Sequence, residues 1–191
     1  MPKIVDHDAR RAEIADAVWR VVRREGIEGA SVRRVAAEAG CSAGSLRHYF
    51  TTQSELVAFA MELVVQRVTD RVVALRPTGP PARRAIAYLE ETIPLDDERR
   101  AEMEVWLAFT ARALVDPALQ ELRDRAHADL RGLCADVVRL LGVRRGVAAE
   151  AERLHALVDG LAMHAVVDPS TTTPRRVRAL LRRHLDALAG A

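Results

Sequence analysis

The segment that most constrains the fold of this 191-residue chain is residues 31–50, SVRRVAAEAGCSAGSLRHYF. Its spacing predicts two short helices separated by a tight turn at residues 40–42. Ser31 and Ser42 stand where a side-chain oxygen can cap the exposed amides of a helix start. Gly40 supplies the left-handed backbone that ends the first helix and turns the chain. Two helices joined this tightly indicate a helix-turn-helix motif.

Each of these two helices is predicted to have a buried and an exposed face. In the first helix, residues spaced by three and four form the buried stripe: Val32, Val35, Ala36 and Ala39. Its charged residues then face outward: Arg33, Arg34 and Glu38. In the second helix, Leu46 and Phe50 are the apolar anchors. The other residues of the second helix are left to meet a partner: Ala43, Gly44, Ser45, Arg47, His48 and Tyr49.

The rest of the chain is also predicted to be helical, because apolar residues recur at helical intervals and glycine and proline fall mainly between the periodic stretches. We expect helices over about 8–25, from 54 to the break at 76–81, and then over about 81–92, 96–115, 117–142, 147–167 and from 174 onward. No alternating strand pattern persists. The predicted fold is all-α, with an N-terminal three-helix unit followed by a larger helical region.

The composition limits the possible classes of function but does not identify one of them. Hydrophobic residues make up 49% of the chain, enough for a substantial core, and the net charge of +2 is too mild to identify a polyanionic partner. Through residue 55, nine basic residues face eight acidic ones, so any DNA binding must depend on their positions. Two cysteines and the lack of a long apolar stretch predict a reducing, cytoplasmic setting without a membrane span.

No catalytic or metal-binding pattern emerges from the spacing of reactive residues. The sequence has no glycine-rich phosphate loop and no paired-cysteine zinc motif. His155 and His164 are nine residues apart, which places them off a single helical face. The prediction is a protein that is not an enzyme, with no metal and no cofactor.

The stretch from Ile14 through Leu56, ending in GCSAGSLRHYFTTQSEL, resembles the DNA-binding domain of the TetR family of bacterial repressors. The positions that carry the resemblance are Gly40, Cys41, Ser42, Gly44, Ser45, Leu46, Tyr49 and Phe50. Two positions depart from the family pattern. Arg47 stands where tyrosine is usual, and Gln53 stands where a phosphate-binding lysine is usual. The first departure affects which base is read, and the second removes one backbone anchor.

The C-terminal region is similar to the choline and betaine-type, BetI-like subgroup of that family, in the segments IPLDDERRAEMEVWLAF and LVDGLAM. This resemblance implies an obligate dimer formed by the last two helices and an effector cavity in each C-terminal domain. We therefore expect a helix-turn-helix DNA-binding domain over 1–53 and a helical effector-binding and dimerisation domain over 54–191. The apolar stripes of the last two helices supply the expected interface: Leu154, Val158, Leu161, Ala165, Leu181, Leu185 and Leu188.

If the helix after Ser42 enters the major groove, its first turn approaches the base edges. Ala43 and Gly44 can contact thymine methyl groups, Ser45 can bond several bases, and Arg47 can bind guanine through two hydrogen bonds. The alternative for Arg47 is contact with phosphate or solvent only. His48 and Tyr49 are candidates for a phosphate or a base, or are partly packed surface residues. The family resemblance implies that Arg33 reaches DNA, and Ser31 and Gln53 are candidate phosphate ligands, with Ser42 at the start of the reading helix.

The expected effector cavity is lined by large or adaptable side chains on the C-terminal helices: Met103, Trp106, Phe109, Met163 and His164. Ordinary core packing is the alternative for each of them. Asp159 lies on an otherwise apolar helix, so its carboxylate needs an internal partner or a cationic ligand.

These patterns together predict a homodimeric DNA-binding regulator, a repressor that a small-molecule effector releases from a near-palindromic operator. Two copies are needed because one short helix reads too few base pairs. One alternative is a helical small-molecule-binding or enzymatic protein whose front domain no longer binds DNA, as Gln53 and the mild charge allow. A second is an architectural protein without any ligand.

Overall fold

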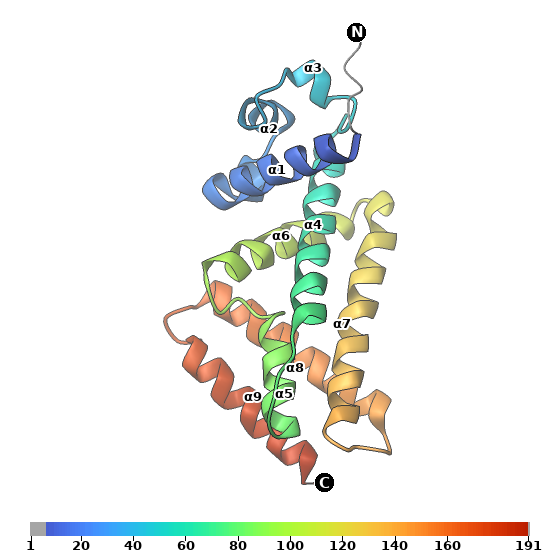
Figure 1. The fold of residues 1–191 in the computed structure, drawn as a ribbon, viewed down its shortest axis with the longest axis vertical. Helices are drawn as coiled ribbons and strands as arrows, with labels where there is room; N and C mark the ends of the chain where they lie inside the picture. Colours follow the sequence, from blue (N-terminus) through green and yellow to red (C-terminus); the bar gives the residue numbers. More distant parts are fainter. Residues whose placement is uncertain (1–6, 191) are drawn as a thin grey trace. The chain divides into compact units, whose positions relative to one another are not determined.

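The computed structural model describes residues 7–190, and this part of the chain is all-α, as predicted (Figure 1). It contains nine α-helices, one 3₁₀ helix and no strand. The helices are α1 His7–Gly29, α2 Val32–Glu38, α3 Ala43–Leu46, α4 Gln53–Ala74, α5 Pro81–Glu90, α6 Asp97–Ala113, the 3₁₀ helix Pro117–Leu119, α7 Gln120–Leu140, α8 Val147–Val167 and α9 Pro174–Ala189. Among these helices, none has the length and apolar character needed to cross a bilayer.

Glycine and proline set most of the helix ends. Gly26 has φ 72° and ψ 169°, so the regular helical path of α1 stops where the sequence predicts, although a further helical turn continues to Gly29. Pro81 and Pro174 occupy the first turns of α5 and α9, where the missing amide hydrogen of proline costs no helical bond. Gly146 precedes α8 in the left-handed conformation.

Contacts divide the chain into two compact units, and α4 and α6 have residues in both. The first unit runs through Val64 and includes Glu104–Gln120. Its core contains an apolar stripe of α1, spaced at helical intervals: Ile14, Ala17, Val18, Val21 and Val22. Within this unit α2 packs against both α1 and α3.

The second unit comprises Val65–Met103 and the chain from Glu121 onward. Its core joins apolar residues of α5, α7, α8 and α9: Ala85, Leu89, Cys134, Val137, Val138, Leu154, Val158, Leu161, Val177, Leu181 and Leu185. Burial and the charge of nearby Asp159 raise the pKa of the Cys134 thiol to about 12, so this cysteine is a neutral packing residue.

A buried ion network fixes the C-terminal half of α4 within the second unit. Arg71 donates two hydrogen bonds to the carboxylate of Glu102, at 2.7 and 2.6 Å, and one to Glu91 at 2.8 Å. Arg99 binds the same Glu91 carboxylate at 2.7 and 2.8 Å. The Glu102 side chain is only 6% exposed, so its charge depends on Arg71. The hydrogen bond to Glu102 is the main cause that raises the pKa of Arg71 above its ordinary value.

We expect Arg71→Ala to lower the free energy of unfolding by about 3 kcal/mol, because it leaves the buried Glu102 carboxylate without its cation. Urea denaturation at matched protein concentrations measures the loss. The control is Arg125→Ala, which breaks an exposed pair with Glu121 on α7 and should change stability by less than about 0.5 kcal/mol. Equal losses in the two variants would contradict a stabilising role for the network.

Candidate nucleic-acid interface

Two serine hydroxyls fix the starts of α2 and α3. Ser31 Oγ accepts a hydrogen bond from the Arg34 amide at 3.3 Å, and Ser42 Oγ accepts one from the Ser45 amide at 3.0 Å. Between them, Gly40 adopts φ +62°, the left-handed conformation predicted for the turn. Each hydroxyl still has its own O–H to donate, so a capping serine can also bind a phosphate oxygen.

The segment after Ser42 is held by two buried side chains. Leu46 and Phe50 are both buried, as predicted, and the Phe50 ring lies 4.9 Å from the Phe59 ring of α4, centroid to centroid. The regular helix α3 is a single turn, and hydrogen-bonded turns continue the chain to Phe50. This is shorter than the helix that the sequence suggested over 43–50.

Acidic residues neutralise several arginines of this unit. Glu38 was expected to face solvent, but its half-buried carboxylate accepts hydrogen bonds from Arg20 at 2.7 Å and Arg24 at 3.0 Å, both on α1. These bonds, first from Arg20 and then from Arg24, hold the pKa of Glu38 below its ordinary value. Arg34 Nε lies 3.5 Å from Glu25. Helical periodicity places Glu38 on a polar face but does not show that α1 supplies its partners.

Arg33 and Arg47 differ from these paired arginines. Both side chains are exposed, and neither forms an ion pair or hydrogen bond with any residue that the structure describes. Arg33 lies in the first turn of α2, and Arg47 directly follows α3. Free guanidinium groups at these two positions are available to an anionic or hydrogen-bonding partner.

The other predicted contact residues of this segment differ in exposure. Gly44, Ser45 and His48 are exposed, whereas Ala43 and Tyr49 are partly buried. The Tyr49 ring centroid lies 6.5 Å from that of Phe50, so this ring also packs against the anchor. The segment therefore presents mainly small side chains around Arg47, which allows close approach of a nucleic acid.

Gln53 has a contact that the sequence did not predict. At the start of α4, its amide nitrogen donates a hydrogen bond of 2.6 Å to the carbonyl oxygen of Ala30. The bond ties α4 to the chain just before α2. The Glu55 carboxylate also accepts a bond of 2.6 Å from the Thr51 amide, which fixes the same helix start.

The six candidate effector residues are divided between the two units. Trp106 and Phe109 belong to the first unit, with Phe109 fully buried and its ring centroid 6.4 Å from that of Trp106. The other four belong to the second unit: Met103, Asp159, Met163 and His164. Of these, Met163 and His164 are exposed on α8. Asp159 is partly buried, and burial raises the pKa of its carboxyl despite the nearby His155 and His127.

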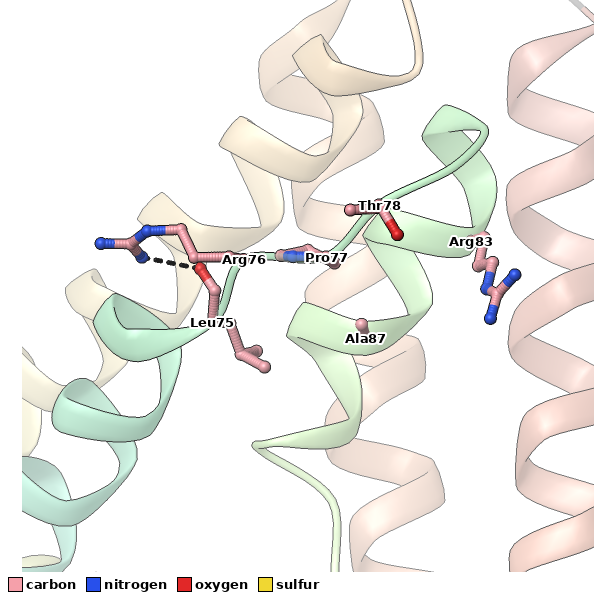
Figure 2. A pocket seen from close by; sticks show the side chains of 6 residues that line it. All are labelled: Leu75, Arg76, Pro77, Thr78, Arg83 and Ala87. Atoms are coloured by element: carbon pink, nitrogen blue, oxygen red, sulfur yellow. Dashed lines mark hydrogen bonds between the residues drawn. The ribbon is translucent and has the colours of Figure 1, made fainter.

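A surface pocket of about 300 Å³ lies at the connection between α4 and α5 (Figure 2). Its lining combines apolar and basic side chains: Leu75, Arg76, Pro77, Thr78, Arg83 and Ala87. Figure 2 shows Arg76 folded back onto the end of α4, where Nη1 donates to the Leu75 carbonyl at 2.7 Å. The sequence marked this segment only as a break between helices, and none of the predicted effector residues lines the pocket.

The apolar stripe expected at a dimer interface lies in the core of the single subunit. Six of its members are buried there: Leu154, Val158, Leu161, Ala165, Leu181 and Leu185. Leu188 packs against the edge of the same core. Periodicity shows that α8 and α9 each have an apolar stripe, but it does not distinguish a face that meets its own chain from one that meets a second copy.

Comparison with known proteins identifies the relatives of this fold. Residues 14–59 match a family model described as bacterial regulatory proteins, tetR family, and residues 81–190 match one described as BetI-type transcriptional repressor, C-terminal. The chain is 44% identical over 196 residues to the HTH-type transcriptional regulator PksA of Bacillus subtilis (strain 168), covering 98% of this chain and 94% of that protein.

Solved structures give the same result. A transcriptional regulator from Rhodococcus sp. Rha1 has a TM-score of 0.80 and 34% identity, covering 93% of this chain and 95% of that one. The multidrug binding protein EbrR, solved in complex with ethidium, has a TM-score of 0.69 and 27% identity, covering 92% and 98%.

These matches extend over both regions of the chain, so they do not favour the alternative of a small-molecule-binding or enzymatic protein with an inactive front domain. Members of such regulator families are typically not enzymes. The chain belongs to the TetR family of bacterial transcriptional regulators, with a helix-turn-helix DNA-binding region and a BetI-type C-terminal region.

Proposed function

We propose that this protein is a homodimeric repressor that binds a near-palindromic operator in the cytoplasm and leaves it when a small molecule binds the C-terminal domain. The observation that carries the DNA part is the contrast in charge around the helix-turn-helix. Arg20, Arg24 and Arg34 pair with acids, while Arg33 and Arg47 remain free and exposed. The match to BetI-type repressors supports repression rather than activation.

In this proposal residues 1–53 bind DNA and residues 54–191 bind the effector and form the dimer. Arg47 reads a guanine, Ser45 bonds a neighbouring base, and Ala43 and Gly44 approach thymine methyl groups. The proposed phosphate ligands are Ser31, Arg33, Ser42, His48 and Tyr49. Gln53 contributes mainly by holding the start of α4 through its bond to Ala30, which supports the interface without replacing the usual lysine.

The dimer would use the outer faces of α8 and α9, because their inner stripes are buried in the subunit. On α8, the outer face carries small and apolar residues spaced by three and four: Ala156, Gly160, Met163 and Val167. Met163 is 40% exposed, and Leu180 on α9 is 39% exposed. Small residues let helices of two copies approach closely, and the two α3 segments would then meet sites about one helical turn, ~34 Å, apart.

The effector would act by shifting a population of dimers. A ligand changes operator affinity only through its different affinities for the DNA-binding and the released conformations. A hundredfold release therefore requires a difference of about 2.8 kcal/mol. A solved relative, EbrR, holds ethidium, which supports a small-molecule effector for this chain as well.

Arg47→Ala is expected to weaken binding to an operator selected from random DNA by about 1–3 kcal/mol per half-site and to relax one base preference. Fluorescence anisotropy on the operator and on single-base variants measures both effects. Arg23→Ala, which removes the same charge from an exposed position of α1, is the matched control. Unchanged base preference in Arg47→Ala would refute the base-reading role.

Arg33→Ala should instead lower the affinity for all DNA sequences by a similar factor, because a phosphate contact carries no base information. The slope of log affinity against log salt concentration should become shallower by about 0.9 for each phosphate that the protein no longer neutralises. Anisotropy titrations over a range of salt concentrations give the slope. A changed base preference with an unchanged slope would exclude this role.

The double variant Met163→Glu with Leu180→Glu should be monomeric and should lose operator binding, because each interface would bury four uncompensated carboxylates. Sedimentation velocity measures the assembly state, and circular dichroism checks that the helices are intact. Ala128→Glu, at an exposed position of α7, is the control and should remain dimeric. A double variant that is still dimeric would place the interface elsewhere.

A further inference from the structure

Three side chains that no sequence motif connects converge between α7 and α8. His127 comes from α7, and His155 and Asp159 come from α8. One ligand atom of each, a ring nitrogen or a carboxylate oxygen, lies within 4.8 Å of the others. His127 is 28 residues before His155 in the sequence, so only the packing of the two helices brings the donors together.

The two α8 residues already have a chelating arrangement. His155 and Asp159 are four residues apart and therefore lie on the same face of the helix. His155 Nε2 is 3.3 Å from Asp159 Oδ2. The His127 and His155 rings have centroids 5.7 Å apart and planes inclined at 60°. The rings thus meet at an angle, which allows a nitrogen of each to point toward one ion.

The His155 nitrogen is an unusual feature of this group. The side chain is only 10% exposed, and among the described residues the buried Nε2 makes no well-aligned hydrogen bond, although Asp159 Oδ2 lies 3.3 Å away. A buried polar atom in this state is unfavourable unless another group satisfies it. Burial, the largest cause, also lowers the pKa of His155.

We propose that His127, His155 and Asp159 bind one divalent first-row transition-metal ion, with Zn²⁺ as the best match. Two imidazole nitrogens and one carboxylate oxygen form a common donor set for such ions, whereas Mg²⁺ and Ca²⁺ require oxygen ligands. Ligands bound tetrahedrally at about 2.0–2.1 Å lie about 3.4 Å apart, close to the observed separation of Nε2 and Oδ2. No pair of donor atoms needs to close by more than about 1.4 Å.

The bound ion would have two consequences for this unit. It would link α7 to α8 through side chains of both helices, and it would satisfy the buried His155 nitrogen. Three protein ligands also leave the fourth tetrahedral position open to water or to a donor atom of a small molecule. The positive charge of Arg131 disfavours a cation at the His127, His155 and Asp159 cluster. The Arg131 side chain is exposed, however, so solvent screens its charge.

The test is a titration of the full chain without a polyhistidine tag, after removal of metal with a chelator. Isothermal titration with Zn²⁺ should show one ion per subunit, and Co²⁺ should give the strong visible absorption of a tetrahedral centre. His127→Ala and Asp159→Asn should each weaken Zn²⁺ binding by about tenfold or more, because each removes one ligand. Asp129→Asn, which removes an exposed carboxylate of α7 outside the cluster, should bind as the unaltered protein does.

Thermal melting separates the loss of a ligand from the loss of the fold. Zn²⁺ should raise the melting temperature of the unaltered protein and of Asp129→Asn, but not of the His127→Ala, Asp159→Asn double variant. Cooperative melting of each metal-free variant confirms that it is folded. If Asp159→Asn is unstable, the His127→Ala variant, at a partly buried residue, decides the outcome. Absence of stoichiometric binding, or equal affinity in the double variant, would overturn the proposal. Because the titration contains neither DNA nor effector, its result is independent of the repressor proposal.

Discussion

The surface that we propose to face DNA depends on the burial of Leu46 and Phe50, because α3 is too short to be a stable helix by itself. Isolated helices of fewer than about 12 residues are marginal in water, and α3 has one regular turn. Its geometry therefore comes from the Phe50–Phe59 contact below it and from the Ser42 cap at its start. The exposed side chains are positioned by these contacts, so any loosening of the anchor would also disorder the groups that we propose to meet DNA.

In this unit, the positions of individual charges matter more than the net charge. The acids that lower the net charge are also the partners of particular arginines, as with Glu38 between Arg20 and Arg24. These pairs hold α1 and α2 together at their exposed side, and they remove two cations from competition for phosphate. Within the helix-turn-helix itself, the arginines left free are in the first turn of α2 and directly after α3. A nearly neutral unit can thus bind DNA in one register, while weak overall attraction limits binding to unrelated sequences.

Local signals in the sequence were sufficient to predict the helices, but they were insufficient to predict which residues of other segments the helices contact. Gly40, the two capping serines and the helix-opening prolines act within a few residues, so the helix starts agree with the structure, although α3 is shorter than predicted. Contacts between segments that are distant in the sequence have no such local signal. The apolar stripe of α8 was predicted, but an inner and an outer stripe look alike until the neighbours of the helix are known. The bond from Gln53 to Ala30 and the meeting of His127 with His155 likewise depend on packing between distant segments.

The two halves of α4 are held by different forces, which bears on how an effector could control DNA binding. The N-terminal half buries Leu56 and Phe59 in the first unit, whereas the C-terminal half is fixed in the second by the ion pairs of Arg71. Close-packed apolar contacts resist gradual displacement, because a small shift opens voids. A guanidinium group with two carboxylate partners can exchange one arrangement for another, since Glu91 is already shared with Arg99. Allosteric coupling requires an element with two discrete arrangements. The charged half of α4 meets that requirement better than the apolar half. It is also continuous with the N-terminal half of α4, which supports α3.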